Sequence, residues 1–243
     1  MGRLFSPYEG TYKVEWGTLL NERQWKSKSI DAVAKVVCKA CNEGWMHDID
    51  VEASATMSNM ILHGSAVSLL PIGITSIARF AYKAAVVIDH ARRDPSGPFF
   101  PPAERKRFSE GDHSIPPGFQ VWISSFRPRG AGVHGSYSGH YGEIKTGKYR
   151  HFKFYVLTYV VGFVLLQAVA YRWGSRLLKP PPFIPYVQQA KSFDVVCTPI
   201  WLPDGKPVLW PTEQAVTNDT VMHIAERWAR VAEWHPSTGG VYD

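Results

Sequence analysis

A pair of cysteines separated by two residues constrains this chain more than any other feature of its sequence. Cys38 and Cys41 enclose a short turn, and Asn42 and Gly44 lead from it into an apolar periodic segment that begins at Trp45. Two thiolates at this spacing can chelate one tetrahedral zinc ion through a turn whose backbone amides also hydrogen-bond to the sulfurs. The spacing therefore predicts a zinc-binding turn directly before a helix. A plain pair of buried thiols and a redox pair are the alternatives.

The residues around this turn resemble a known family. Residues 36–46 read Val-Val-Cys-Lys-Ala-Cys-Asn-Glu-Gly-Trp-Met. They resemble the second zinc knuckle of a bacterial and phage family of HNH-endonuclease-like proteins, whose pattern is a hydrophobic pair, C-x-x-C-N and a glycine–tryptophan helix start. Weaker likeness continues at 83–89, at Val121 and Trp122, and at 162–167. The likeness touches about two-thirds of the chain, but the knuckle is its specific part.

The resemblance implies metal-assisted hydrolysis of phosphodiester bonds in DNA. Cys38 and Cys41 would hold a structural zinc ion, and Asn42 would contribute an amide oxygen to a catalytic Mg²⁺ or Mn²⁺ ion. In the family, the other two zinc ligands come from an earlier C-x-x-C, and a general-base histidine lies between the two knuckles. Here no cysteine precedes Cys38, and the first histidine is His47, beyond the turn.

Three explanations for the missing half stay open. The true protein is longer than this chain, or the chain is a decayed nuclease kept for binding, or a partner chain or a second copy supplies the other ligands. The alternative to a nuclease is thus a non-catalytic DNA-binding or structural protein on the same scaffold. The chain has 243 residues and a net charge of +6. This balance favours anionic partners such as DNA without identifying one.

Three cysteines in a chain of this length do not make a disulfide framework, and the first residues do not form a secretory signal. We therefore expect a cytoplasmic protein. Hydrophobic periodicity predicts an α+β fold. Together with the resemblance, it implies that a remnant of a ββα-type zinc knuckle and a first helix (1–64) precede a body of helices and mostly antiparallel strands (65–243).

The expected elements follow from periodicity and from turn residues. Two amphipathic helices that share a core are expected over 45–63, ending at Gly64, and over 75–90, capped by Thr75 or Ser76. The other expected elements are strands over 11–16, 34–37, 119–126, 152–164 and 194–201, a short helix over 103–109 and a last helix over 219–233. The proline-rich residues 92–118 are expected to form a connecting surface, and the glycine-rich residues 130–142 a loop.

Residues 154–171 form an uncharged run of 18 residues. This is the lower limit for a helix that spans a membrane, so a single-span membrane protein is a third class to weigh. Gln167 lies within the run, and the first half is rich in β-branched and aromatic residues. These features favour a buried strand followed by a short helix.

Other polar groups have a functional and a structural interpretation. His134 and His140 could bind a metal or a phosphate, and His47 could replace a missing zinc ligand, but surface positions are commoner for such histidines. The basic residues 105–107 and Lys39 could contact DNA phosphates, although charge runs of this size are usually solvated. None of these residues is chosen as a site residue.

Overall fold

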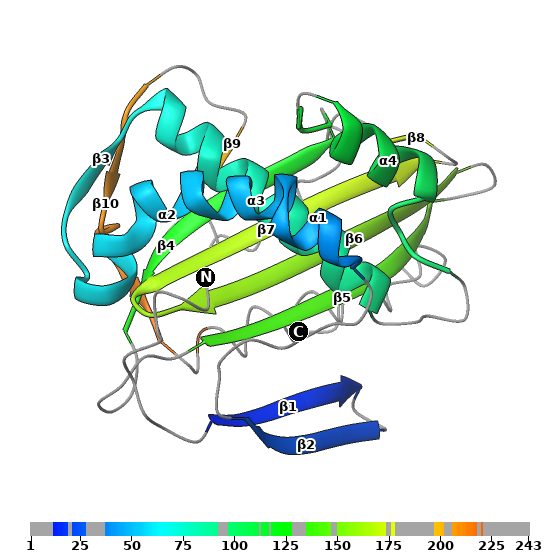
Figure 1. Ribbon diagram of the computed structural model, residues 1–243, viewed down its shortest axis with the longest axis horizontal. Helices are drawn as coiled ribbons and strands as arrows, with labels where there is room; N and C mark the ends of the chain where they lie inside the picture. Colours follow the sequence, from blue (N-terminus) through cyan, green and yellow to red (C-terminus); the bar gives the residue numbers. More distant parts are fainter. Residues whose placement is uncertain are drawn as a thin grey trace.

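A computed structural model confirms the α+β class, with the described helices lying over one face of a mostly antiparallel sheet (Figure 1). The structure describes, with side chains, residues 37–91, 97–111, 113–116, 118–127, 153–172, 197–201, 206–217 and 220. It describes the backbone alone of residues 12–18, 21–27, 135–146, 150–152, 173 and 176–177. The predicted strand over 34–37 lies outside the described residues except for Val37, and the predicted helix over 219–233 does so except for Thr220.

The main sheet has seven strands in the order β11-β4-β7-β6-β5, with β8 paired to β7 and β9 paired to β4. Its strands are β4 (Phe119–Phe126), β5 (Gly135–Thr146), β6 (Arg150–Val161), β7 (Val164–Trp173), β8 (Arg176–Leu177), β9 (Thr198–Trp201) and β11 (Ala215–Val216). All pairings are antiparallel except that of β11 with β4. Two small antiparallel sheets join β1 (Tyr12–Thr18) with β2 (Asn21–Ser27) and β3 (Val67–Leu69) with β10 (Val208–Trp210).

The centre of the sheet is a long hairpin formed by β6 and β7. It contains the uncharged run 154–171, so the expectation of a strand followed by a short helix is wrong in its second half. The run is continuously apolar because both faces of these strands are buried, and a helix and a doubly buried strand look alike in such a sequence. Gly162, at a φ of 54°, makes the tight turn between the strands.

The helices are α1 (Lys39–Glu43), α2 (Trp45–His63), α3 (Pro71–Ala91) and α4 (Pro102–Glu110). The predicted bounds of α2 are confirmed, and Gly64 ends it in the left-handed conformation. The N–H of Gly64 donates to the carbonyl of Met60, and the N–H of Ser65 donates to that of Asn59. The start of α3 was predicted four residues too late. Thr75 and Ser76 do not cap it, because their hydroxyls donate to carbonyls one turn earlier within the helix.

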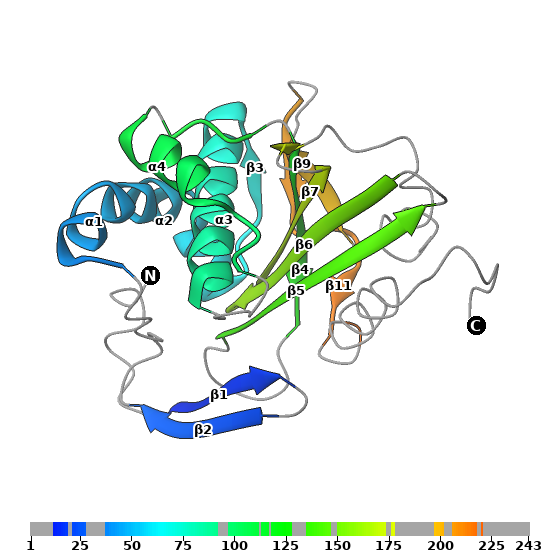
Figure 2. The ribbon, with the colours of Figure 1, turned by 90° about the vertical axis from the view of Figure 1, so that its right-hand side faces the viewer.

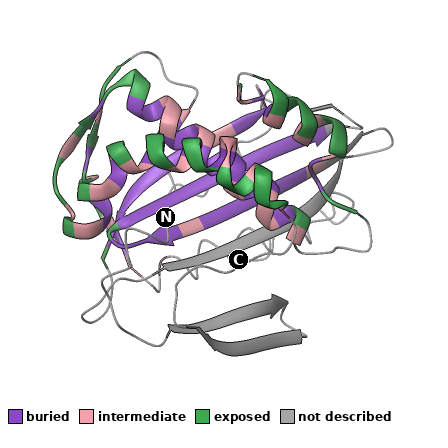
Figure 3. Ribbon diagram, viewed as in Figure 1, coloured by how far each residue is buried: buried purple, intermediate pink, exposed green. Residues whose placement is uncertain are grey.

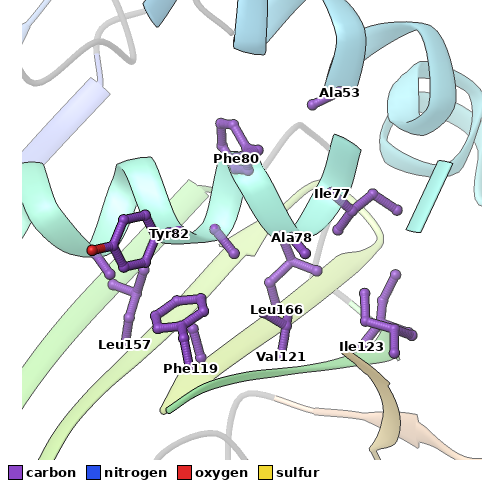
Figure 4. Packing of buried hydrophobic residues seen from close by; sticks show 14 of the residues in the cluster. Ala53, Ile77, Ala78, Phe80, Tyr82, Phe119, Val121, Ile123, Leu157 and Leu166 are labelled. Atoms are coloured by element: carbon purple, nitrogen blue, oxygen red, sulfur yellow. The ribbon is translucent and has the colours of Figure 1, made fainter. Parts of the chain in front are cut away.

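The core lies between α3 and the sheet. Figure 4 shows Ile77, Ala78 and Tyr82 of α3 above side chains of the strands below them. Tyr82 meets the ring of Phe119 edge-on with centroids 5.0 Å apart, a favoured arrangement for aromatic pairs. Full burial of such side chains contributes about 1.5–3 kcal/mol each. Residues from both sides of position 64 belong to this one core cluster.

The proline-rich segment is more than a connecting surface. Phe99, Phe100 and Phe108 are buried within the core cluster, with exposed fractions of 5% or less. The ring of Tyr82 contacts both Phe100 and Phe108. Prolines exclude long regular elements here, but they do not exclude burial of the residues between them. The glycine-rich loop expected over 130–142 is likewise wrong from Gly135 onward, where the backbone forms β5.

The described helices lie on one side of the sheet (Figure 2). Even so, the strands β4, β6 and β7 are buried on both faces, which is why they are purple almost throughout in Figure 3. Alternate residues belong to the core cluster under the helices, and those between them are buried on the opposite face. We call this opposite face of β4, β6 and β7 the far face.

Within the described residues, α3 is the helix long and apolar enough to cross a membrane by length and composition. Most of it is buried, because it packs between α2 and the sheet. A core helix of this kind passes the same test as a membrane span. The candidate span considered from the sequence, 154–171, is a β-hairpin.

Candidate metal-binding turn

Backbone hydrogen bonds within residues 38–44 hold the turn from Cys38 to Gly44 in shape. Cys38 caps α1 in an extended conformation, and the N–H of Asn42 donates to its carbonyl at 3.0 Å. Gly44 ends α1, its N–H donating to the carbonyl of Ala40. A Cβ at this position would lie 2.8 Å from that carbonyl oxygen, so the turn requires glycine. The chain can therefore pass directly into α2 at Trp45.

The two thiols of the turn are coupled. The backbone N–H of Cys41 donates to the Cys38 sulfur at 3.3 Å. The Cys41 thiol and this N–H lower the pKa of Cys38, whereas the hydrogen bond to Cys38 raises the pKa of Cys41. Cys38 is exposed and Cys41 is half-buried, and neither forms a disulfide. Cys38 is thus the first thiolate of the pair and the more accessible one.

Trp45 connects this turn to the body of the protein. Its indole nitrogen is buried and makes no hydrogen bond of ordinary geometry. The interaction of this N–H with the Cys41 thiol still lowers the pKa of Cys41. The indole ring stacks on His113 with centroids 5.5 Å apart and meets the edge of Phe108 at 5.5 Å. Trp45 is therefore held by residues of the proline-rich segment.

His113 is a residue that the sequence reasoning missed. It has a φ of 57°, in the left-handed region that few residues other than glycine adopt. Its Nδ1 lies 2.7 Å from the carbonyl oxygen of Phe108. A carbonyl only accepts, so Nδ1 carries a proton in this contact. No sequence pattern links His113 to Trp45, because the contact exists only after α4 has packed against α2.

A partly buried ion pair joins α2, the helix that follows the turn, to α3. Lys83 lies on α3, 6% exposed, and its ammonium donates to Asp50 of α2 and, at 3.4 Å, to the carbonyl of Met46. Burial lowers the pKa of Lys83, and the carboxylate of Asp50 opposes this shift. The ammonium also lies 5.2 Å from the centroid of the Phe80 ring. Lys83 thus fixes the first turn of α2 and, with it, the position of Trp45.

The other candidate residues are not gathered at this turn. Asn42 and His47 are exposed, on α1 and α2 respectively. His134, and the side chain of His140, lie outside the described part of the chain. Within that part, no three His, Cys, Asp or Glu side chains form a group that could hold a metal ion. The turn therefore presents two thiols, half the number of ligands that a tetrahedral zinc site needs.

Three of the basic residues considered for phosphate contact, Arg105, Lys106 and Lys39, have partners within the protein. Arg105 has Nη1 3.0 Å from Nδ1 of His90 and 3.3 Å from the carbonyl of Phe100. Lys106 lies 3.9 Å from Glu110, and Lys39 lies 3.9 Å from Glu43. Exposed pairs at this distance are weak, so the lysines can still exchange them for a phosphate.

Comparison of the chain with protein families, with curated proteins and with solved structures finds no match. The resemblance to HNH-endonuclease-like proteins therefore depends on the residues of the turn themselves.

The unequal thiols lead to a prediction that needs no metal. We expect iodoacetamide to alkylate Cys38 at lower pH than Cys41 in chelator-treated protein. The thiolate is the nucleophile, and only Cys38 has a pKa shifted below the ordinary 9.0. Because Lys39 separates the two cysteines, trypsin places them in different peptides for mass spectrometry. Cys41→Ala should move Cys38 alkylation to higher pH, and equal rates at the two thiols would contradict the coupling.

Proposed function

We propose that the chain is an HNH-endonuclease-like protein that acts on DNA and that its Cys38–Cys41 turn is half of a structural zinc knuckle. The observation that carries this proposal is the Cys41 N–H donated to the Cys38 sulfur at 3.3 Å, directly before a helix that starts at Trp45. Amide N–H groups aimed at sulfur stabilise thiolates, which are the form that binds zinc. A redox pair would need a lowered pKa at an accessible cysteine, which Cys38 also has, but within the described residues no βαβ unit precedes this turn.

The two thiols of the turn are ligands of the kind that zinc binds, but a tetrahedral zinc site needs two more. Cys38 and Cys41 would hold the ion, and the other two ligands would come from outside the described residues or from a second copy of the chain. A structural zinc ion supplies folding energy by joining two segments of chain. The residues of this turn bind and orient: Gly44 sets the path, Trp45 anchors it to α4, and Lys83 fixes the helix behind it.

A second candidate is a non-catalytic DNA-binding protein on the same scaffold. It is favoured by one observation, that among the described residues no three His, Cys, Asp or Glu side chains form a group that could hold a catalytic metal ion. Phosphodiester hydrolysis needs a base to activate water and an ion to stabilise the developing charge. Asn42 alone provides neither a base nor a full coordination sphere.

Metal content is the measurement that tests the zinc knuckle. We expect the purified chain to hold one zinc ion per chain if it supplies all four ligands, and one per two chains if a second copy shares the site. The double variant Cys38→Ser/Cys41→Ser should lose the zinc, while Cys197→Ala, which removes the buried cysteine away from the turn, should retain it. Elemental analysis by mass spectrometry gives the ratio. A wild-type chain without zinc would overturn the knuckle.

Cleavage then separates the two candidate functions. If the zinc-bound wild type cuts plasmid DNA in the presence of Mg²⁺ or Mn²⁺ and Asn42→Ala does not, the result supports the nuclease. A chain that binds zinc and shifts DNA in a gel without cutting it would support the non-catalytic binding protein. A chain with zinc that neither binds nor cuts DNA would overturn both.

A further inference from the structure

The two sulfurs of the Cys38–Cys41 turn are held close together by the protein itself. Their side chains share a hydrogen bond, and the N–H of Cys41 also donates to the Cys38 sulfur at 3.3 Å. The N–H of Asn42 donates to the carbonyl of Cys38 at 3.0 Å and so closes the turn between them. Neither sulfur is part of a disulfide in this structure. The two thiols are therefore neighbours in a turn that is already formed.

The turn has the dimensions that a disulfide bond requires. Cys38 and Cys41 are three residues apart, and the hydrogen bond from Asn42 to Cys38 encloses them in a single helical turn. The Cα atoms of residues three apart in such a turn are separated by about 5 Å. Disulfides form where the two Cα atoms are about 4.4–6.8 Å apart. A bond between the two sulfurs can therefore form without unfolding of the turn.

The cysteines of the chain differ in their access to solvent. Cys38 is exposed and Cys41 is half-buried, whereas Cys197 is only 1% exposed. Trp45 lies against Cys41, since its indole N–H interacts with that thiol, and its ring packs on Phe108 of α4. A reagent in solution therefore reaches Cys38 first, and Cys41 is the nearest second thiol. Burial keeps Cys197 out of this reaction.

Metal binding and disulfide formation compete for the same two sulfurs. Zinc binds cysteine as the thiolate, so each ligand must keep its sulfur reduced. A disulfide removes both thiolates at once, and with them both of the ligands that the turn can offer. An exposed disulfide is also readily reduced by thiols in solution, so the change is reversible. The oxidation state of this one pair can therefore control whether the turn holds a metal ion.

We propose that the Cys38–Cys41 turn is a redox switch, in which a small-molecule disulfide such as glutathione disulfide oxidises the two thiols to an intramolecular disulfide and the turn releases its zinc ion. This inference rests on the proposed zinc knuckle. The Cys38 thiolate attacks one sulfur of glutathione disulfide, forms a mixed disulfide and expels one glutathione thiolate. The Cys41 thiolate then attacks the Cys38 sulfur and expels the second. Both glutathione thiolates take up a proton from solvent, so two cysteines are oxidised and one glutathione disulfide is reduced.

Incubation of the zinc-loaded, full-length chain with glutathione disulfide tests the switch. We expect the chain to lose the mass of two hydrogen atoms, and zinc to appear in solution with the same time course, as read by mass spectrometry and a chromogenic zinc indicator. Excess reduced glutathione should restore both thiols and the uptake of zinc. In Cys41→Ser the reaction should stop at a glutathione adduct on Cys38. In Cys38→Ser an adduct on Cys41 should form more slowly, because that thiol is half-buried.

Zinc content before oxidation separates the failure of this inference from that of the proposed function. A chain that holds zinc but keeps it in glutathione disulfide, or forms only glutathione adducts, would rule out the switch and leave the knuckle in place. A chain without zinc before oxidation would rule out both. Cys197→Ala should oxidise and release zinc as the wild type does, and the oxidised chain should run as a monomer on a non-reducing gel. A disulfide-linked dimer, or loss of oxidation in Cys197→Ala, would contradict a bond between Cys38 and Cys41.

Discussion

Gly162→Ala should be among the most destabilising single substitutions in this chain, with a loss of about 4 kcal/mol in the free energy of unfolding. Gly162 has a φ of 54°, where a side chain is strained. A Cβ there would lie 2.0 Å from the carbonyl oxygen of Ile61, so backbone would have to move. That same carbonyl accepts the N–H of Phe163 at 3.2 Å, so the movement also breaks a contact between α2 and the β6–β7 turn.

Gly97→Ala is the matched control. Gly97 has a φ of 84°, also positive, but a Cβ there would meet nothing within 4 Å. It should lose only about 1 kcal/mol, the strain of the left-handed conformation alone. Urea denaturation of the two variants separates strain from the clash. Equal losses would mean that the close approach of Gly162 to Ile61 does not contribute to stability.

The contact at Gly162 also shows what sequence patterns can and cannot predict. The bounds of α2 and β4 were predicted because their signals are local: a three- and four-residue apolar period ending at Gly64, and a β-rich run. Burial on both faces removes the alternation from both strands of the β6–β7 hairpin. Its first half was predicted because it is rich in β-branched and aromatic residues, whereas its second half is rich in leucine and alanine. The turn that divides the run depends on one glycine.

Only the local part of the candidate site, the Cys38–Cys41 turn, was predicted from the sequence. The spacing of Cys38 and Cys41 led to the metal-binding turn, and the structure adds the hydrogen bond between them. The contacts that hold the turn come from distant parts of the chain: His113 stacks on Trp45, and Lys83 pairs with Asp50. Pairings of this kind follow from packing of helices, and a single sequence carries no pattern for them.

The second large effect is expected at the ion pair between β7 and α4. Arg172 and Glu104 form two parallel hydrogen bonds of 2.8 Å, and their side chains are only 5% and 14% exposed. Arg172→Met should lose about 3–5 kcal/mol, because the carboxylate of Glu104 would remain buried without its cation. The guanidinium also lies 5.1 Å from the centroid of the Phe99 ring, and that contact would be lost as well.

Two further variants show whether the charge is the cause. Arg172→Met/Glu104→Leu should recover most of the loss, since an apolar pair of similar volume can replace a buried ion pair without a large penalty. Lys106→Met, which removes the cation of an exposed pair on the same helix, should change stability by no more than about 0.5 kcal/mol. If the double variant is no more stable than Arg172→Met, lost packing rather than an unpaired carboxylate is responsible.

The same ion pair connects stability with the metal-binding turn. Glu104 and Phe108 lie on α4, and Phe108 contacts both Trp45 and His113. Arg172→Met should therefore loosen the packing of Trp45 even where the chain remains folded, since α4 would no longer be fixed to β7. Restoration of zinc affinity and stability together in the double variant would show that the sheet positions the turn through α4. Restored stability with zinc affinity still lowered would contradict this route.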